Sequence, residues 1–225
     1  YDKGRELVQK LLAGTNIALI TDAGTPGISD PGEELVKMAY EAGIEVTSLP
    51  GACACVTALT LSGLSTRRFV FEAFLPPDKK EHKLALERLK NETRTMIVYE
   101  APHHLLKTLR ELLETLGNRR LTLCRELTKK HETAWQTTIE DAITRYEQED
   151  PKGECVLVIE GRSQKEIEDE AKAAFEEISI EEHMKRYEDQ GIARKEAMKL
   201  VAKDRGVTKR DIYQYLLGKE SYNDF

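Results

Sequence analysis

A loop of small and turn-forming residues is the first part of the chain that could form a binding site. Residues 20–32 read ITDAGTPGISDPG and contain three glycines, two prolines and two aspartates. Gly24 and Gly27 can adopt a positive φ and let a ligand approach the backbone, while Asp22 offers a carboxylate to an amine or a ribose hydroxyl. An apolar run precedes the loop and a helical pattern follows it. The loop thus lies at the end of a predicted strand, the place where open α/β sheets bind ligands. The pattern favours a small-molecule site, and a purely structural turn is the alternative.

A second loop of the same character follows the next predicted strand. Residues 49–58 read LPGACACVTA, a Pro-Gly turn that leads into a helix of small residues. Because the first amides of a helix lack partners within it, the N–H groups of Cys53 and Ala54 would face a ligand bound there. No Gly-Lys-Ser/Thr sequence follows either loop, and the glycine spacing does not match a dinucleotide fingerprint. The two loops together therefore indicate a small-molecule site of another kind.

The elements that must position these loops alternate in the manner of an α/β protein. The sequence predicts helices over residues 3–13, 32–42, 53–62, 79–91, 102–115 and 139–147. It predicts strands over residues 17–20, 44–49, 69–75, 95–100, 121–127, 134–139 and 154–161. The short spacing between 121–127 and 134–139 indicates a hairpin, so we expect a parallel sheet in the first part of the chain and a mixed sheet in the second.

Beyond Gly161 the pattern becomes helical, with no further strand. An acid-rich stretch over 165–182 precedes a predominantly basic stretch over 183–210, and Ser179 with Glu182 forms a capping-box pair. We expect three short helices in a helix-turn-helix-like arrangement, which either contacts RNA or serves as a docking domain with solvated basic residues. The predicted domains are an N-terminal α/β subdomain, a mixed α/β subdomain and a helical domain, over residues 1–68, 69–162 and 163–225.

The bulk composition fits a globular protein with one large or two small domains. The chain has 225 residues and a net charge of −6, which argues against gross electrostatic attraction to nucleic acid but not against a local basic surface. No apolar run approaches the ~20 residues of a membrane span and no secretory signal is visible. We therefore expect a cytoplasmic protein that makes no membrane contact.

The four cysteines lack CxxC spacing and lie in apolar segments, at Cys53, Cys55, Cys124 and Cys155. We interpret them as buried reduced thiols, with a metal site or a disulfide as the alternative.

Six motifs follow one another along the chain: ALITDAGTPGISDPGEELV, LPGACACVTAL, FEAFLP, MIVYEAPHHL, CRELTKKHE and GECVLVIEG. In this order they resemble the bacterial ribosomal RNA small subunit methyltransferase I family, which belongs to the tetrapyrrole-methylase (class III) superfamily. The resemblance extends from about residue 5 to residue 217. The family normally begins with a strand and a loop of the form GTPIGN, and neither occurs here. We therefore expect the first strand of the sheet to be missing from this chain.

The resemblance implies an α/β fold of the tetrapyrrole-methylase type, with two α/β subdomains and a C-terminal helical domain. It implies 2′-O-methylation of a cytidine in the decoding region of 16S rRNA, with S-adenosylmethionine as methyl donor and no metal. It also implies 16S rRNA or the small ribosomal subunit as partner, and a homodimer. The cofactor-binding residues it implies are Asp22, Ala23, Gly24, Gly27, Cys53, Ala54, Glu100, Leu127 and Glu154.

Methyl transfer to a 2′-hydroxyl requires a general base or a cation that stabilises the developing charge. The motif CRELTKKHE offers both, and we expect Lys129 or Glu126 to assist deprotonation. The alternative is that these charges position phosphates or each other, while proximity and orientation provide the rate. Local basic clusters could follow an RNA backbone, at residues 67–68, 79–80, 82–83, 119–120 and 129–130.

Two other functions stay open at this point. One is methylation of a tetrapyrrole or, as in diphthine synthesis, of a protein by an enzyme of the same superfamily. The other is a non-catalytic ribosome-assembly factor that binds RNA.

Overall fold

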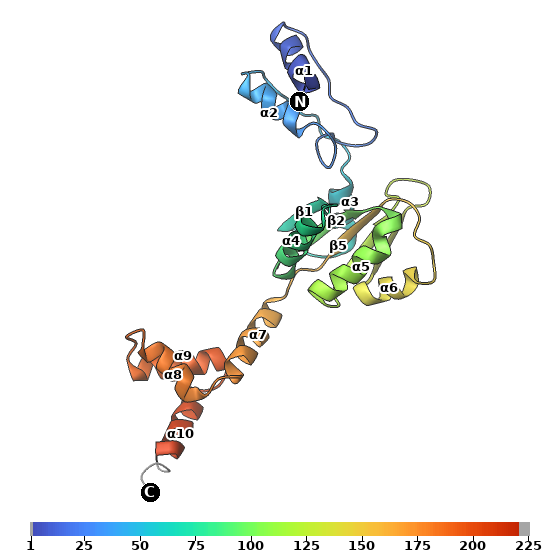
Figure 1. Cartoon of the computed structure of the whole chain (residues 1–225). Helices are drawn as coiled ribbons and strands as arrows, with labels where there is room; N and C mark the ends of the chain where they lie inside the picture. The colour runs from blue at the N-terminus through green and yellow to red at the C-terminus, as the bar shows by residue number, and fades with distance from the viewer. Residues whose placement is uncertain (1, 221–225) are drawn as a thin grey trace. The chain divides into compact units, whose positions relative to one another are not determined.

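The computed structural model describes residues 2–220, and the chain forms two compact units, Tyr1–Gly161 and Arg162–Phe225 (Figure 1). The first unit begins with α1 (Asp2–Leu12), α2 (Glu33–Glu41) and α3 (Ala54–Ser62). Strands and helices then alternate, as β1 (Phe69–Phe74), α4 (Lys79–Lys90), β2 (Thr95–Glu100), α5 (Pro102–Leu116), β3 (Arg120–Arg125), β4 (Thr133–Thr138), α6 (Ile139–Tyr146) and β5 (Cys155–Ile159). The division into domains at residues 68 and 162 stays a prediction.

The strands of the first unit form one five-stranded sheet in the order β1-β2-β5-β3-β4. The pair β1–β2 is parallel, and the pairs β2–β5, β5–β3 and β3–β4 are antiparallel. The predictions of a mixed sheet and of a hairpin between the third and fourth of these strands are therefore confirmed. In β1 the register shifts between Phe71 and Ala73, and Ala73 has a φ of 54°, so the end of this edge strand is bulged.

Helices cover both faces of the sheet. On one face α4, α5 and α6 pack against strand residues such as Met96, Leu123 and Leu157. On the other face α3 packs against Ile97, Cys124 and Val156. The strand residues alternate between these two sets because successive side chains of a strand point to opposite faces. Figure 1 shows the same arrangement, with α4 and α5 lying over the sheet.

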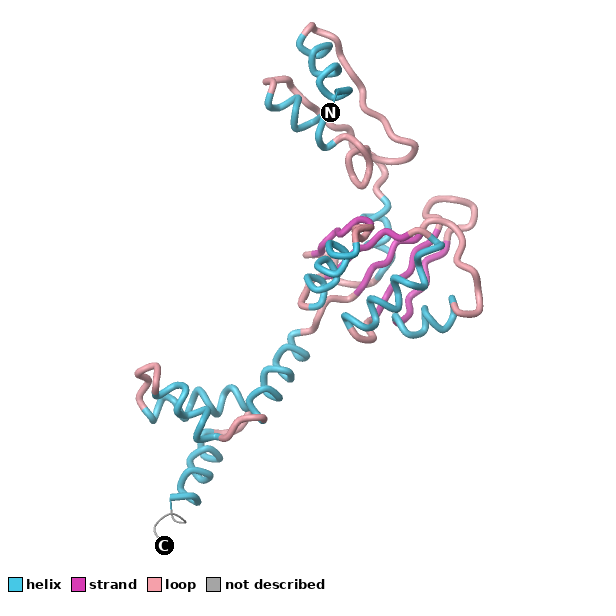
Figure 2. Tube along the Cα trace, in the orientation of Figure 1, coloured by secondary structure: helices cyan, strands magenta, loops and turns pink. Residues whose placement is uncertain are grey.

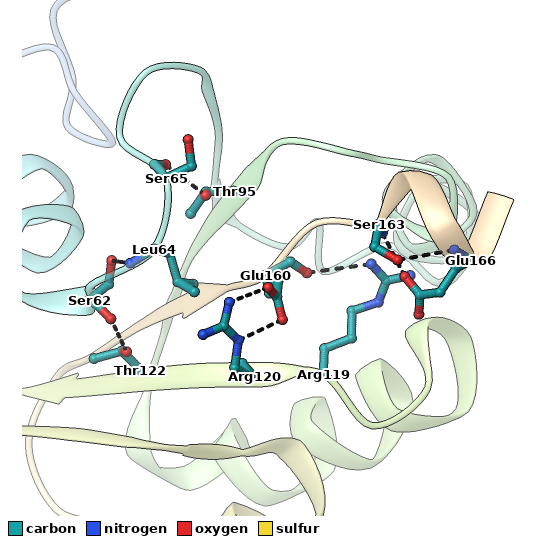
Figure 3. A network of polar contacts seen from close by, with 10 residues as sticks. All are labelled: Ser62, Leu64, Ser65, Thr95, Arg119, Arg120, Thr122, Glu160, Ser163 and Glu166. Carbon is teal, nitrogen blue, oxygen red and sulfur yellow. Dashed lines mark hydrogen bonds and ion pairs between the residues drawn. The ribbon is translucent and has the colours of Figure 1, made fainter. Parts of the chain in front are cut away.

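Hydrogen bonds attach the end of α3 to the sheet. The Thr122 hydroxyl of β3 donates to the Ser62 carbonyl at 3.1 Å, and the Thr95 hydroxyl of β2 donates to the Ser65 carbonyl at 2.8 Å (Figure 3). In the same region Arg120 forms a two-pronged ion pair with Glu160, whose shorter contact joins NH2 to Oε1. The bonds from Thr122 and Thr95 hold the C-terminal end of α3 on the sheet. The N-terminal end of α3 lies against the last residues of β2, where Cys55 is bonded to Tyr99.

The predicted strands over residues 17–20 and 44–49 are wrong, since both segments are loops (Figure 2). A strand is stable only when a neighbour satisfies its backbone groups, and within the described residues neither segment joins a strand ladder. Ile20 and Leu49 are 83% and 82% exposed. The helices α1 and α2 instead contact each other, with Val8 and Ala39 buried. The parallel sheet predicted for the first part of the chain is thus absent from the described residues, and β1 and β2 form the parallel pair.

The second unit contains α7 (Gln164–Glu176), α8 (Ile180–Glu188), α9 (Arg194–Arg205) and α10 (Lys209–Glu220) in its described part. The sequence predicts only the last three, because α7 lies in the acid-rich stretch with little apolar periodicity. The capping box that the structure contains joins Ser163 to Glu166 at the start of α7. At α8 the Ser179 hydroxyl accepts the Glu182 N–H at 3.1 Å. No helix of the described residues is long and apolar enough to cross a membrane.

A buried histidine connects the helices of this second unit. His183 is 1% exposed and stacks on Phe175 with ring centroids 4.3 Å apart. Its Nδ1 accepts a hydrogen bond from Arg205 Nε at 3.2 Å, so its Nε2 carries the proton and faces Asp204 Oδ2 at 3.2 Å. Burial, and then the charge of Arg205, lowers the pKa of His183. The folded unit therefore requires the neutral ring.

This arrangement predicts that acid weakens the second unit before the first. A group whose pKa is lowered by folding contributes its full stability above its unfolded-state pKa, about 6.5 for histidine, and loses it as the pH falls through the folded value. We expect amides of α8 and α9 to lose protection from hydrogen exchange between about pH 8 and about pH 5, while amides of β2 and β5 keep it. The measurement is hydrogen exchange with mass spectrometry on the whole chain, corrected for intrinsic rates.

His183→Gln is the matched variant, because it keeps a hydrogen-bonding side chain that does not titrate. It should remove the pH dependence at a cost of about 1–3 kcal/mol in the free energy of unfolding. Equal protection of α8 and α9 at both pH values in the unmodified chain would contradict this account.

Candidate active site

The two glycine-rich loops, residues 20–32 and 49–54, are in contact with each other. The Thr25 N–H donates a hydrogen bond to the Ala52 carbonyl at 2.9 Å. Gly24 has a φ of +81°, and a Cβ there would lie 2.7 Å from the Ala52 oxygen. A Cβ on Gly51 would lie 2.7 Å from Thr25 Oγ1. The contact therefore requires glycine at position 24 and leaves little room for a side chain at position 51. It brings together two loops that the sequence places about thirty residues apart.

The predicted ligand-facing groups of these loops remain accessible. Asp22, Ala23, Gly24 and Ala54 are exposed, whereas Gly27 and Cys53 are half-buried. The Asp22 carboxylate makes no hydrogen bond or ion pair with the described part of the chain. Cys53 is the extended residue that precedes α3, with φ −142° and ψ 114°. The backbone geometry thus presents the start of α3 as an N-terminal helix end, joined through Ala52 to the loop that carries Asp22.

Tyr99 anchors the start of α3 to the sheet. The Cys55 N–H donates to the Tyr99 hydroxyl at 2.9 Å, and burial strongly raises the pKa of that tyrosine. The Tyr99 ring meets the edges of Phe71 and Phe74, at centroid distances of 4.9 and 5.7 Å. Reasoning from the sequence missed this positioning role, although Tyr99 lies beside the predicted site residue Glu100 in the motif MIVYEAPHHL.

A second group of predicted site residues meets where β3 ends and β5 begins. Lys129 Nζ lies 3.2 Å from Glu126 Oε1 and 3.0 Å from Glu154 Oε2. The Glu154 N–H donates to Glu126 Oε1 at 3.0 Å, and the Glu126 N–H donates to the Glu154 carbonyl at 3.1 Å. Gly153, with a φ of +78°, makes room for this carboxylate, since a Cβ there would collide with the Glu126 side chain. The three charged side chains therefore form one fixed cluster, which we call the Lys129 cluster.

Electrostatics favour the charged forms of Glu126 and Lys129. The hydrogen bond from the Glu154 backbone, and then the Lys129 ammonium, lowers the pKa of Glu126. Glu154 and then Glu126 raise the pKa of Lys129. A protonated lysine cannot accept a proton, and a carboxylate of lowered pKa is a weak base. The geometry therefore suits Lys129 as a cation better than either residue as a general base.

Two other predicted cofactor residues lie on opposite faces of the sheet. Leu127 packs on the α3 face, in the apolar cluster that includes Cys53 and Tyr99. Glu100 is buried on the α5 face, where its carboxylate accepts the Ala101 N–H at 2.8 Å and the Thr108 hydroxyl at 2.6 Å. The structure thus groups Leu127 with the start of α3 and sets Glu100 apart from it.

The cysteines are free, and Cys53 is the one that is not buried. Within the described residues, His, Cys, Asp and Glu side chains do not gather in groups of three or more that could hold a metal ion.

Solved structures with the same fold include two methyltransferases. The methyltransferase CobJ matches with a TM-score of 0.55 and 19% identity, over 71% of this chain and 70% of that one. The uroporphyrin-III-C-methyltransferase from Thermus thermophilus matches with a TM-score of 0.50 and 21% identity, over 70% of each chain. At this identity the likeness shows the fold, which agrees with the predicted tetrapyrrole-methylase type.

Sequence comparison identifies the family. The sequence pattern of the tetrapyrrole (corrin/porphyrin) methylases matches residues 2–143. A protein of Synechocystis sp. named ribosomal RNA small subunit methyltransferase I is 44% identical over 98% of this chain and 78% of its own length. Its namesake from Halalkalibacterium halodurans is 47% identical over 93% of this chain and 72% of its own length. The chain therefore belongs to the ribosomal RNA small subunit methyltransferase I family of the tetrapyrrole methylases.

Proposed function

We propose that this protein is an S-adenosylmethionine-dependent methyltransferase that 2′-O-methylates a cytidine ribose in the decoding region of 16S rRNA. The observation that carries the proposal is the identity of 44–47% to relatives named ribosomal RNA small subunit methyltransferase I. The contact between the two glycine-rich loops supports it, because small-residue loops can bind a zwitterionic nucleoside through backbone groups and the Asp22 carboxylate.

The polar groups of the loops fit S-adenosylmethionine in chemistry. The exposed Asp22 carboxylate can accept from ribose hydroxyls or from the amino group of the ligand, and the amides of Cys53 and Ala54 can donate to its carboxylate. The absence of a side chain at Gly24 lets the Ala52 carbonyl approach, which keeps the two loops together. When bound, the cofactor supplies an electrophilic methyl group on a sulfonium. The proposed cofactor-binding set is completed by Leu127, Glu154 and Glu100. The Glu100 carboxylate is already hydrogen-bonded, so we assign this residue to holding the end of β2 in place.

The Lys129 cluster supplies charge for the proposed reaction. A ribose 2′-hydroxyl becomes a better nucleophile as its proton leaves, and the oxygen then carries negative charge that an ammonium stabilises. Lys129 offers this ammonium, while Glu126 and Glu154 fix its position. Glu126 is therefore assigned to orienting Lys129 rather than to accepting the hydroxyl proton.

We infer that the partner is the small ribosomal subunit or its 16S rRNA, and that the protein recognises the shape of the RNA rather than stacking on its bases. Aromatic residues make up only 6% of the sequence, so stacking platforms are few. In the second unit, basic residues of α8 and α9 such as Lys185, Arg186 and Lys199 are exposed around a buried core, which suits contact with phosphates. A homodimer and a cytoplasmic location accompany this proposal.

Calorimetry with S-adenosylmethionine tests the cofactor assignment. We expect saturable heat of binding, and its absence in the reduced, folded chain would remove the methyltransferase proposal.

Label transfer from methyl-labelled S-adenosylmethionine then tests the substrate, with small ribosomal subunits, free 16S rRNA and a tetrapyrrole precursor as parallel acceptors. We expect label at a cytidine 2′-oxygen of the RNA, whereas label confined to the tetrapyrrole would assign the enzyme to the other branch of its superfamily.

Gly24→Ala tests whether the loop contact holds the cofactor site. An alanine there adopts an unfavourable φ, at a cost of about 1–2 kcal/mol, and its Cβ also meets the Ala52 carbonyl. We expect S-adenosylmethionine to bind about tenfold more weakly or worse, measured by calorimetry. Gly14→Ala is the matched control, because Gly14 has a φ of +89° with no atom near the added Cβ. Equal losses in the two variants would mean that the loop contact does not matter for binding.

Lys129→Ala tests the proposed cation, with Lys130→Ala as the control for removal of one positive charge from the same turn. We expect Lys129→Ala to lower kcat for methyl transfer by about tenfold to a hundredfold, with Lys130→Ala acting mainly on KM. Glu126→Gln should lower kcat less than Lys129→Ala does, since Glu154 still holds the ammonium. Unchanged turnover in both Lys129→Ala and Glu126→Gln would exclude the Lys129 cluster from catalysis.

A further inference from the structure

Two thiols meet at the start of α3, next to the contact between the glycine-rich loops. Cys53 Sγ lies 3.3 Å from Cys55 Sγ, and the pair shares a hydrogen bond. The two differ in access, because Cys53 is half-buried while Cys55 is 5% exposed. The remaining thiols, Cys124 and Cys155, are at most 2% exposed within β3 and β5. The chain thus places one reachable thiol directly beside a second one.

We propose that Cys53 and Cys55 form a dithiol site that a low-molecular-weight disulfide oxidises to an intramolecular disulfide. The Cys53 thiolate attacks one sulfur of the incoming disulfide, which forms a mixed disulfide and releases the first thiol. The Cys55 sulfur then attacks Cys53 Sγ, which closes the protein disulfide and releases the second thiol. The two protons lost from Cys53 and Cys55 end on the two released thiols, and the incoming disulfide is the species reduced.

Access and protonation fix the order of these steps. Burial, and then the hydrogen bond to Cys53, raises the pKa of Cys55 to about 11. Cys55 therefore keeps its proton, and the more accessible Cys53 is the sulfur that meets the oxidant. Once the mixed disulfide exists, Cys55 needs no diffusion to reach it, because the sulfur atoms are already neighbours.

The backbone around Cys53 allows the two sulfur atoms to come within bonding distance. A disulfide bond is about 2.0 Å long, so one sulfur must move by more than an ångström from its present place. Cys55 is fixed in the first turn of α3 by its N–H bond to Tyr99. Cys53 is extended and lies outside the helix, so its side chain is free of the rotamer restriction within a helix turn. Cys53 is therefore the residue that moves.

That movement acts on the proposed cofactor site, and this consequence rests on the proposed function. The Cys53 carbonyl accepts the Thr57 N–H and the Thr57 hydroxyl, both at 3.0 Å, and the preceding carbonyl, of Ala52, accepts the Thr25 N–H. A bridge between residues 53 and 55 pulls on the first turn of α3 and on the loop contact together. The oxidised chain should therefore bind S-adenosylmethionine more weakly, by about tenfold or more, and recover on reduction.

The first test is chemical and does not depend on the function. The whole folded chain is treated with glutathione disulfide and analysed by intact mass and by peptide mapping under non-reducing conditions. We expect a product lighter by two hydrogen atoms, with residues 53 and 55 linked and Cys124 and Cys155 still free. Cys55→Ser should instead retain one glutathione on Cys53, and Cys53→Ser should gain neither a bridge nor an adduct. A native chain that resists oxidation, or reacts first at Cys124 or Cys155, would overturn the proposal.

The second test measures the affinity for S-adenosylmethionine before and after the oxidant, by calorimetry. We expect the native chain to lose affinity, and Cys53→Ser to show the same affinity in both conditions, whatever its own level. If the reduced native chain binds no S-adenosylmethionine, the proposed function fails while the mass result still decides the dithiol site. If the bridge forms and the affinity is unchanged, the regulatory consequence is excluded.

Discussion

One hydrogen bond joins the candidate cofactor loops to the sheet, from the Cys55 N–H to the Tyr99 hydroxyl. Tyr99 can serve as this anchor because aromatic rings from β1 hold it on two sides. From Cys55 the connection continues through the first turn of α3 to the Ala52 carbonyl, and from there to Thr25 in the other loop. Since residues 17–20 and 44–49 join no strand ladder in the described chain, these contacts carry the positioning that parallel strands would otherwise provide.

The Lys129 cluster depends on a different constraint, which is backbone strain. Glu126 and Thr128 have φ values of 52° and 62°, although neither is glycine. Such conformations cost of order 1–3 kcal/mol each and persist where the surroundings over-determine them. Here the paired bonds between Glu126 and Glu154 supply that support, and Gly153 removes the side chain that would prevent it. Strain of this kind gathers at active sites, so it is independent support for the proposed role of the cluster.

The second half of the fold could be predicted from the sequence, because its strands are apolar runs that pair with neighbours in the same chain. Residues 17–20 have the same apolar signal and form no strand, since periodicity reports what a segment could bury but not whether a partner is present. The helix α7 escaped prediction because its charges conceal the pattern. In the candidate site, the glycine content of the sequence identified both loops. The contact between Gly24 and Ala52 follows only from the three-dimensional structure. For Glu100 the sequence suggests a ligand contact, because the residue lies in a family motif. It does not reveal that the Glu100 carboxylate already accepts a hydrogen bond from the Thr108 hydroxyl.

The two groups of site residues divide the proposed chemistry between backbone and side chains. The loops offer amides, carbonyls and the exposed Asp22 carboxylate, so they suit a ligand with many polar groups and tolerate little added volume. In the Lys129 cluster the pKa values of Glu126 and Lys129 lie further from neutrality than those of the free groups. Neither Glu126 nor Lys129 changes its charge in the neutral range, so neither can relay protons efficiently there. For the proposed reaction this favours rate enhancement through a preorganised charge and a fixed orientation, with the hydroxyl proton passing to solvent as the methyl group is transferred.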